Sequence, residues 1–310
     1  MLYLYVPFPH PGRYLCHMQL VLLTALTMIA FAANSVLNRM AVDGMFIDPG
    51  SFALIRVVSG AAVLGMVLTV RGGRMQMRVK PRLIGAVSLS VYMVGFSLAY
   101  LTLDAGLGAL ILFGTVQMTM FAHAARQPEG LGTRRLIGAL VAFAGLIYVL
   151  APGAGGPAYL SGAVMMIAAG LGWAVYTIAG RSEADALGAT AANFLIAVPM
   201  LTLLLVGGGT DVTFTGAGLA ILSGAVTSGL GYALWYSVLP RLETSAAAVV
   251  QLSVPVIAIA GGVLFLGEQL TLRIILAAIV VLGGIAVAVT ASPAQADRKA
   301  APHPDQMPED

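Results

Sequence analysis

The stretch that decides the fold runs from residue 136 to residue 180 and reads LIGALVAFAGLIYVLAPGAGGPAYLSGAVMMIAAGLGWAVYTIAG. No Asp, Glu, Lys or Arg occurs between Arg135 and Arg181, and a turn rich in Pro and Gly at 152–157 divides the stretch in two. About 20 apolar residues in helical conformation cross the hydrocarbon core of a bilayer. The stretch therefore predicts two membrane-spanning helices, at 134–151 and 158–180.

The rest of the chain repeats this pattern. Hydrophobic residues make up 59% of the sequence and charged residues 9%, whereas a soluble domain carries about 25% charged residues. So few charges cannot cover a water-soluble surface, so most of the chain must face lipid. Further apolar runs predict eight more helices, at 18–38, 50–70, 82–101, 105–123, 188–206, 215–238, 244–266 and 272–290. The expected fold class is an all-α polytopic membrane protein with ten transmembrane helices.

The two ends of the chain differ from the spans. Residues 1–17 contain Pro7, Pro9 and Pro11 and lack a sustained apolar core, so they predict no cleavable signal peptide. We interpret them as a leader or a misassigned start, because Met18, at the beginning of the first apolar run, is a more usual first residue for a membrane protein. Residues 291–310 are rich in Ala, Pro and charge, which predicts a disordered tail.

Several function classes are disfavoured by what the sequence lacks. The net charge of +3 gives nucleic-acid binding little support, and the single cysteine, Cys16, excludes an intrachain disulfide and a cysteine-based metal site. No phosphate-binding Gly-Lys-Ser or Gly-Lys-Thr segment and no His-Glu-x-x-His motif occurs. We therefore expect no cofactor, no metal and no enzymatic activity, and only a small-molecule substrate and the lipid bilayer as partners.

The basic residues predict the orientation. With the N-terminus in the cytoplasm, the inside segments hold all but three of the 16 Lys and Arg residues. The exceptions are Arg39 and Arg273 in outside loops and Arg56 within a helix. Cytoplasmic loops are enriched in Lys and Arg, so this bias predicts an even number of spans with both ends of the chain in the cytoplasm. A bacterial-type inner membrane is the expected location.

From about Leu83 to Leu150 the first half of the chain resembles the second half at a constant offset. This offset carries Gly85 onto Gly224 and Asp104 onto Glu243, and it also carries Glu129 onto Glu268 and Arg134 onto Arg273. Residues 18–151 and 158–290 would then be two five-helix repeats joined by 152–157. An odd number of spans inverts the second repeat, and inverted repeats that enclose a midplane site are typical of secondary transporters with alternating access.

Three segments resemble the EamA-type transporters of the drug/metabolite transporter superfamily. They are FAANSVLNR at 31–39, SFALIR at 51–56, and QLSVPV at 251–256 continuing to GVLFLGE at 262–268. The resemblance covers most of 18–290 and implies ten helices in two inverted five-helix repeats with cytoplasmic termini. It also implies transport of amino acids, other metabolites or drugs. One departure is that LFGTV at 112–116 lacks a counterpart of Pro255, so the two repeats could bend differently.

Arg56 is the first candidate for substrate binding. An Arg at membrane depth costs about 2.5–3.5 kcal/mol on insertion scales, so it should face the bundle interior or water. It could anchor a substrate carboxylate. The alternative is a structural Arg that reaches outward or pairs with Asp43 or Asp48.

Buried amides and aromatic rings are the other candidates. Asn34 and Asn38 share one face of the first helix, and Gln117 and Gln251 lie on the fourth and ninth. These amides could line the site or bond neighbouring helices. Aromatic rings with polar tips could hold an amphiphilic substrate, or could simply pack or lie at the interface. They are Tyr92, with Phe96 and Tyr100, on the third helix; Trp173 and Tyr176 on the sixth; and Tyr232, Trp235 and Tyr236 on the eighth.

Three further residues are candidates for gating. Pro255 removes a backbone hydrogen bond and could provide a hinge in the ninth helix or a static kink. Glu129 and Glu268 lie at loop junctions, each five residues before an Arg, and we interpret them as gate or capping residues. No Asp or Glu falls near the middle of a span, so carboxylate-based proton coupling has little support.

These observations favour a secondary transporter or facilitator for a small organic metabolite, with an amino acid or related carboxylate as the favoured substrate. Export is preferred to import on family analogy alone. The alternative within transport is an exporter of hydrophobic cationic drugs. The alternatives of another class are a channel and a membrane-embedded enzyme.

Overall fold

The structure is a computed structural model that describes residues 11–127, 132–151, 156–180, 183–204, 211–242 and 244–290. Within these residues ten helices are long and apolar enough to cross a membrane, so the predicted fold class is confirmed. The only β pairing in the described part is an isolated bridge between Ile47 and Val212.

The helices of the first half each correspond to one span. They are α1 (Pro11–Asp43), α2 (Pro49–Val70), α3 (Val79–Ala99), α4 (Ala105–Ala125) and α5 (Thr133–Leu150).

The second half is less regular, because its eighth and ninth spans change helix type or break. Its elements are α6 (Gly156–Gly180), α7 (Ala186–Leu204), α8 (Phe214–Leu222), the π-helix η1 (Ser223–Leu230), α9 (Gly231–Val238), the 3-10 turn η2 (Leu239–Arg241), α10 (Thr244–Gln251), α11 (Ser253–Gly261), the π-helix η3 (Gly262–Leu266) and α12 (Leu272–Val289).

Short polar side chains fix several helix starts. Asp48 accepts a hydrogen bond from the Ser51 N–H over 2.9 Å at the start of α2, and Thr213 and Thr271 cap α8 and α12 in the same way. The expected ranges agree with the structure to within a few residues at most ends. The first span is longer than expected and continues to Asp43, and the ninth is interrupted at Leu252, three residues before Pro255.

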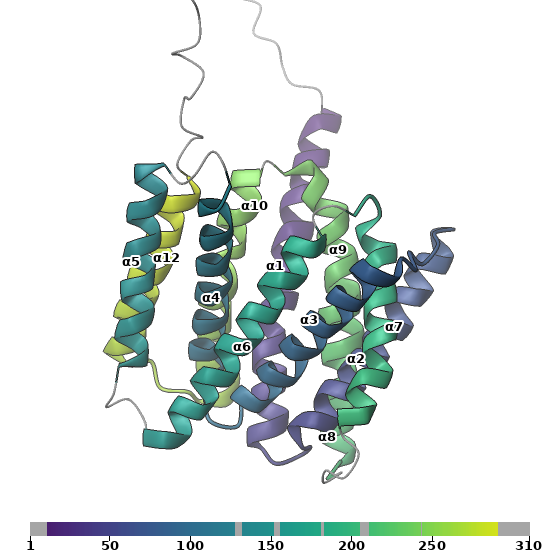
Figure 1. Ribbon diagram of the computed structural model, residues 1–310, viewed down its shortest axis with the longest axis horizontal. Helices are drawn as coiled ribbons and strands as arrows, with labels where there is room; N and C mark the ends of the chain where they lie inside the picture. The colour runs from purple at the N-terminus through teal and green to yellow at the C-terminus, as the bar shows by residue number, and fades with distance from the viewer. Residues whose placement is uncertain are drawn as a thin grey trace, which may run out of the picture.

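The helices form two groups that α1 and α6 join (Figure 1). The α2 group contains α2, α3, α7, α8, η1 and α9, and the α4 group contains α4, α5, α10, α11, η3 and α12. Helix α6 packs against α3 on one side and α4 on the other, and α1 packs against η1 and α9 on one side and α11 on the other. The main contacts between the two groups therefore run through α1 and α6.

The helix contacts also form matched pairs. The α3–α6 contact has its counterpart in α1–α9, the α4–α6 contact in α1–α11, and the α3–α7 contact in α2–η1. The start of α1 and the end of α12 lie at the same end of the bundle (Figure 1). Such pairing is what an inverted repeat predicts, and the repeat remains a prediction.

Glycines allow the closest helix contacts. A methyl group on Gly284 of α12 would lie 2.5 Å from the Ala142 backbone nitrogen and 2.7 Å from the Gly138 carbonyl oxygen of α5. The two backbones are in direct contact there, as small residues permit in membrane helices. The opposite faces of these helices carry exposed apolar side chains such as Phe143 and Ile279, as expected of surfaces in lipid.

Candidate substrate-binding site

Arg56 of α2 lies at the centre of the candidate site. Its side chain is fully buried, and Nε donates to the Ser228 hydroxyl over 3.0 Å while Nη2 donates to the Tyr92 hydroxyl over 3.0 Å. The third nitrogen, Nη1, is buried and has no hydrogen-bond partner among the residues that the structure describes. A guanidinium offers five donors, so this side chain retains binding capacity.

Aromatic rings surround the guanidinium. Its central carbon lies 5.3 Å from the Tyr92 ring centroid and 5.1 Å from that of Phe96, both within cation–π range. No carboxylate pairs with Arg56 within the described part of the chain: Asp43 pairs with Arg39 over 3.0 Å, and Asp48 caps α2. Arg56 is therefore a buried cation held by hydroxyls and rings.

The aromatic residues expected from the sequence meet in one cluster. Trp173 of α6 lies at its centre, with its ring centroid 5.0 Å from Tyr92, 5.4 Å from Tyr176 and 5.4 Å from Tyr232. Phe31 of α1 contacts both Tyr232 and Trp235 edge-on. The cluster thus joins α1, α3, α6 and α9 directly beside Arg56.

A chain of hydroxyl groups lies next to this cluster. The Tyr176 hydroxyl donates to the Thr190 hydroxyl over 2.9 Å, and Thr190 donates to Tyr236 over 3.0 Å. Tyr176 and Tyr232 are almost fully buried, and Tyr236 is half-buried. The described conformation therefore shields the centre of the site from solvent.

The two asparagines of α1 bond to different helices. The Asn34 carbonyl oxygen accepts hydrogen bonds from Ser223 over 2.8 Å and from Thr227, both in η1. The Asn38 amide donates to Ser97 of α3 over 2.9 Å, while its own oxygen is buried without a partner in the described part of the chain. Both amides therefore connect helices, which is the alternative role that the sequence left open.

The two glutamines and the proline lie in the α4 group. Gln117 on α4 and Gln251 at the end of α10 are half-buried, and Pro255 is buried in α11. Arg56 and the aromatic cluster lie on other helices, namely α2 for Arg56 and α1, α3, α6 and α9 for the cluster. None of the hydrogen bonds and ring contacts described for Arg56 and the aromatic cluster involves these three residues.

Glu268 caps a helix of the other half of the chain. One of its carboxylate oxygens accepts a hydrogen bond from the Ala105 N–H over 2.6 Å, at the start of α4. Burial raises the pKa of the Glu268 carboxyl above its usual range, and the Ala105 N–H opposes this shift. Arg273 does not meet Glu268 but donates to the Tyr148 and Ala151 carbonyls at the end of α5. Glu129 lies outside the described residues.

A buried ion pair that sequence reasoning missed lies at the opposite end of the bundle. Arg82 of α3 is 2% exposed, pairs with Glu183, and donates to the Ala189 carbonyl over 2.8 Å. The basic-residue bias counts Arg82 among the Lys and Arg residues of the inside segments. Asn193, which accepts from Arg82 over 3.3 Å inside an apolar run, is the signal that could have indicated a buried partner.

Comparisons with known proteins identify relatives of this chain. The sequence pattern of the EamA-like transporter family matches residues 160–290. An uncharacterized protein of Pseudomonas aeruginosa is 46% identical over 283 residues, which are 91% of this chain and 98% of that protein. The chain belongs to the EamA-like transporter family.

More distant relatives extend the comparison. An uncharacterized transporter of Archaeoglobus fulgidus is 25% identical over 253 residues, which cover 79% of this chain and 90% of that one. A chain in a solved crystal structure superposes with a TM-score of 0.63 at 21% identity, over 86% of this chain and 98% of the other, which shows a shared fold. As a member of the EamA family, the protein is a multi-pass membrane transporter.

Proposed function

We propose that this EamA-family member moves a small organic metabolite that carries a carboxylate, with an amino acid or related acid as the favoured class. The observation that carries the proposal is the Arg56 guanidinium, which is fully buried with one nitrogen unpartnered in the described structure. Burying a cation in a membrane bundle costs free energy, and ionisable residues at such positions typically mark a binding site or a transport pathway. A substrate carboxylate would supply the missing acceptor and the missing negative charge.

The aromatic cluster suits the rest of such a substrate. Tyr92, Trp173 and Tyr232 offer ring faces, and the hydroxyls of Tyr176 and Thr190 offer polar contacts close by. A cationic drug would meet Arg56 at the same place, and no carboxylate pairs with Arg56 among the described residues. Like-charge repulsion in a site of low dielectric therefore favours the anionic class.

The helix groups support alternating access. Because α1 and α6 carry the main contacts between the α2 group and the α4 group, tilting one group against the other would open one end of the bundle and close the other. The α1–α5 and α6–α12 segments would be inverted repeats. The basic-residue bias supports a bacterial-type inner membrane with both termini in the cytoplasm. The proposed direction is export, which rests on family analogy alone.

The test is counterflow in proteoliposomes with a panel of amino acids, other organic acids and cationic dyes. We expect saturable exchange of at least one anionic or zwitterionic compound, and Arg56→Gln should lower it at least tenfold. Arg71→Gln, at an exposed position, is the matched control and should exchange at the wild-type rate. The absence of saturable exchange across the whole panel would overturn the proposal, and so would unchanged transport in a correctly folded Arg56→Gln variant.

A further inference from the structure

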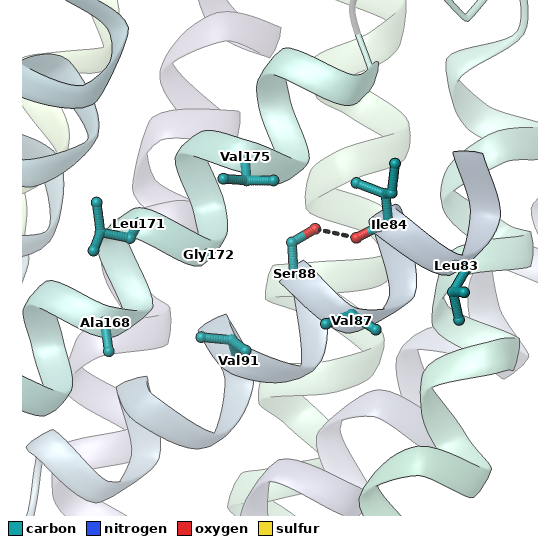
Figure 2. A pocket seen from close by; sticks show the side chains of 9 residues that line it. All are labelled: Leu83, Ile84, Val87, Ser88, Val91, Ala168, Leu171, Gly172 and Val175. Atoms are coloured by element: carbon teal, nitrogen blue, oxygen red, sulfur yellow. Dashed lines mark hydrogen bonds between the residues drawn. The ribbon is translucent and has the colours of Figure 1, made fainter. Parts of the chain in front are cut away.

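A groove opens between α3 and α6 on the outside of the bundle (Figure 2). It has a volume of about 480 Å³, and Leu83, Ile84, Val87 and Val91 of α3 face Leu171 and Val175 of α6 across it. The only hydroxyl in the lining belongs to Ser88, and it donates to the Ile84 carbonyl over 2.6 Å. The groove therefore presents hydrocarbon and no free hydrogen-bonding group of a side chain.

Gly172 gives the groove its depth. A methyl group at this position would lie 2.7 Å from the Ser88 carbonyl oxygen and 2.9 Å from the Tyr92 nitrogen, so α6 meets the backbone of α3 there. The larger side chains stand on either side of this contact, and Leu83, Val91 and Leu171 are each about half exposed. Because both helices belong to membrane spans, the groove faces the acyl chains of the bilayer.

Basic residues lie at the end of the groove where α3 begins. Arg78 and Lys80 lie at the start of α3, shortly before Leu83, and both are exposed. Arg82 is not among them, because it is buried against Glu183. Lys and Arg residues next to a membrane span attract anionic lipids.

We propose that the groove and these basic residues bind one anionic phospholipid. An acyl chain lies between α3 and α6, and the phosphate lies against Arg78 and Lys80. An α-helix rises about 1.5 Å per residue, so Lys80 stands less than one turn of α3 before Leu83, where the apolar lining begins. One lipid molecule can therefore engage both features at once.

The experiment is native mass spectrometry of the full-length protein with phosphatidylglycerol or phosphatidylcholine of identical acyl chains. We expect the wild-type protein to retain phosphatidylglycerol at least fivefold more than phosphatidylcholine. Val87→Trp and Leu171→Trp fill the groove and should reduce retention of both lipids at least fivefold. The double variant Arg78→Gln and Lys80→Gln should retain the two lipids equally, because only the charge contacts are lost.

Ile279→Trp is the matched control, because Ile279 is a lipid-facing residue of α12 with 63% exposure and lies outside the groove. It should retain lipid like the wild type, and gel filtration should show that every variant is folded. Equal retention of the two lipids by the wild type would overturn the headgroup assignment. Unchanged retention in both folded tryptophan variants would overturn the groove assignment. If the wild-type protein is a dimer and Val87→Trp dissociates it, a second copy of the protein, and not a lipid, occupies the groove.

Discussion

The Tyr92 hydroxyl accepts a hydrogen bond from Nη2 of Arg56 over 3.0 Å, and the same tyrosine ring lies 5.3 Å from the guanidinium carbon. One side chain of α3 thus holds the cation of α2 in two ways. The hydroxyl takes up one donor, while the ring stabilises the charge without using another. This arrangement leaves Nη1 available, and it makes the ring and the hydroxyl separately testable.

We predict that the ring of Tyr92 matters more for transport than its hydroxyl. Tyr92→Phe retains the cation–π contact and frees a second guanidinium nitrogen, so KM for an anionic substrate should stay within about threefold of the wild type. Tyr92→Leu removes the ring, whose contact with Arg56 is worth about 0.5–2 kcal/mol, and should raise KM about tenfold. Counterflow kinetics measure both values. Equal losses in the two variants would show that the hydroxyl is the essential group.

The α5–α12 contact should tolerate an added methyl group at Gly283 but not at Gly284. Gly284→Ala places a methyl group 2.5 Å from the Ala142 nitrogen, so α12 must move away, and we expect a loss of about 1–3 kcal/mol in stability. At Gly283 no atom lies within 4 Å of the added methyl. Gly283→Ala should therefore keep or slightly raise the melting temperature, because Ala favours helix. Equal melting temperatures for the two variants would contradict the described packing.

Breaking the buried ion pair should destabilise the protein strongly. Glu183→Gln leaves the Arg82 guanidinium without its carboxylate in a site where the side chains are 3% and 10% exposed. An unpaired buried charge costs about 3–5 kcal/mol. Asp211→Asn, at an exposed position, serves as the control and should unfold like the wild type. Unfolding in denaturant monitors both variants, and equal stability would show that water or another group solvates Arg82.

Glu268 should make stability depend on pH. Burial raises its pKa in the folded protein, so the folded state holds this proton more tightly than the unfolded chain does. The stabilisation is complete below the ordinary pKa of a Glu and is lost as pH rises through the raised pKa of the folded state. Melting temperatures measured from about pH 4 to pH 8 should fall across this range in the wild type.

Glu268→Gln separates this effect from those of other carboxyl groups. Its side chain cannot ionise, so the difference in melting temperature between variant and wild type should change across the same pH range. A difference that is constant with pH would show that Glu268 does not titrate there. A difference of the opposite sign would show that the Ala105 N–H outweighs burial.

Hydropathy predicted the ten spans, because the length and composition of an apolar run decide whether it crosses a bilayer. The break at Leu252 lies three residues before Pro255, from which the sequence indicates a hinge or a kink in the ninth helix. Hydropathy did not predict the π-helical segments of the eighth and ninth spans. These irregularities depend on contacts with other helices. Gly224 in η1, for example, packs directly against the backbone of Arg56.

The candidate site was predicted in its residue types but not in its pairings. Arg56 and the aromatic residues are candidates because polar groups and the polar tips of aromatic rings need partners within a membrane. The sequence did not predict the hydrogen bond from Arg56 to Ser228 or the one from Ser223 to Asn34. Partners so far apart in sequence meet only because their helices pack against each other. The periodicity of residues along one helix does not predict which other helix it contacts.

The division of the bundle into an α2 group and an α4 group has a consequence for how such a chain could be assembled. The first half supplies α2 and α3 to one group and α4 and α5 to the other, and the second half does the same. If the chain were cut between α5 and α6, neither fragment would own a complete group. Each fragment would need helices of the other to complete either group. A half expressed by itself should therefore not fold as an independent unit, whereas the two halves expressed together should assemble.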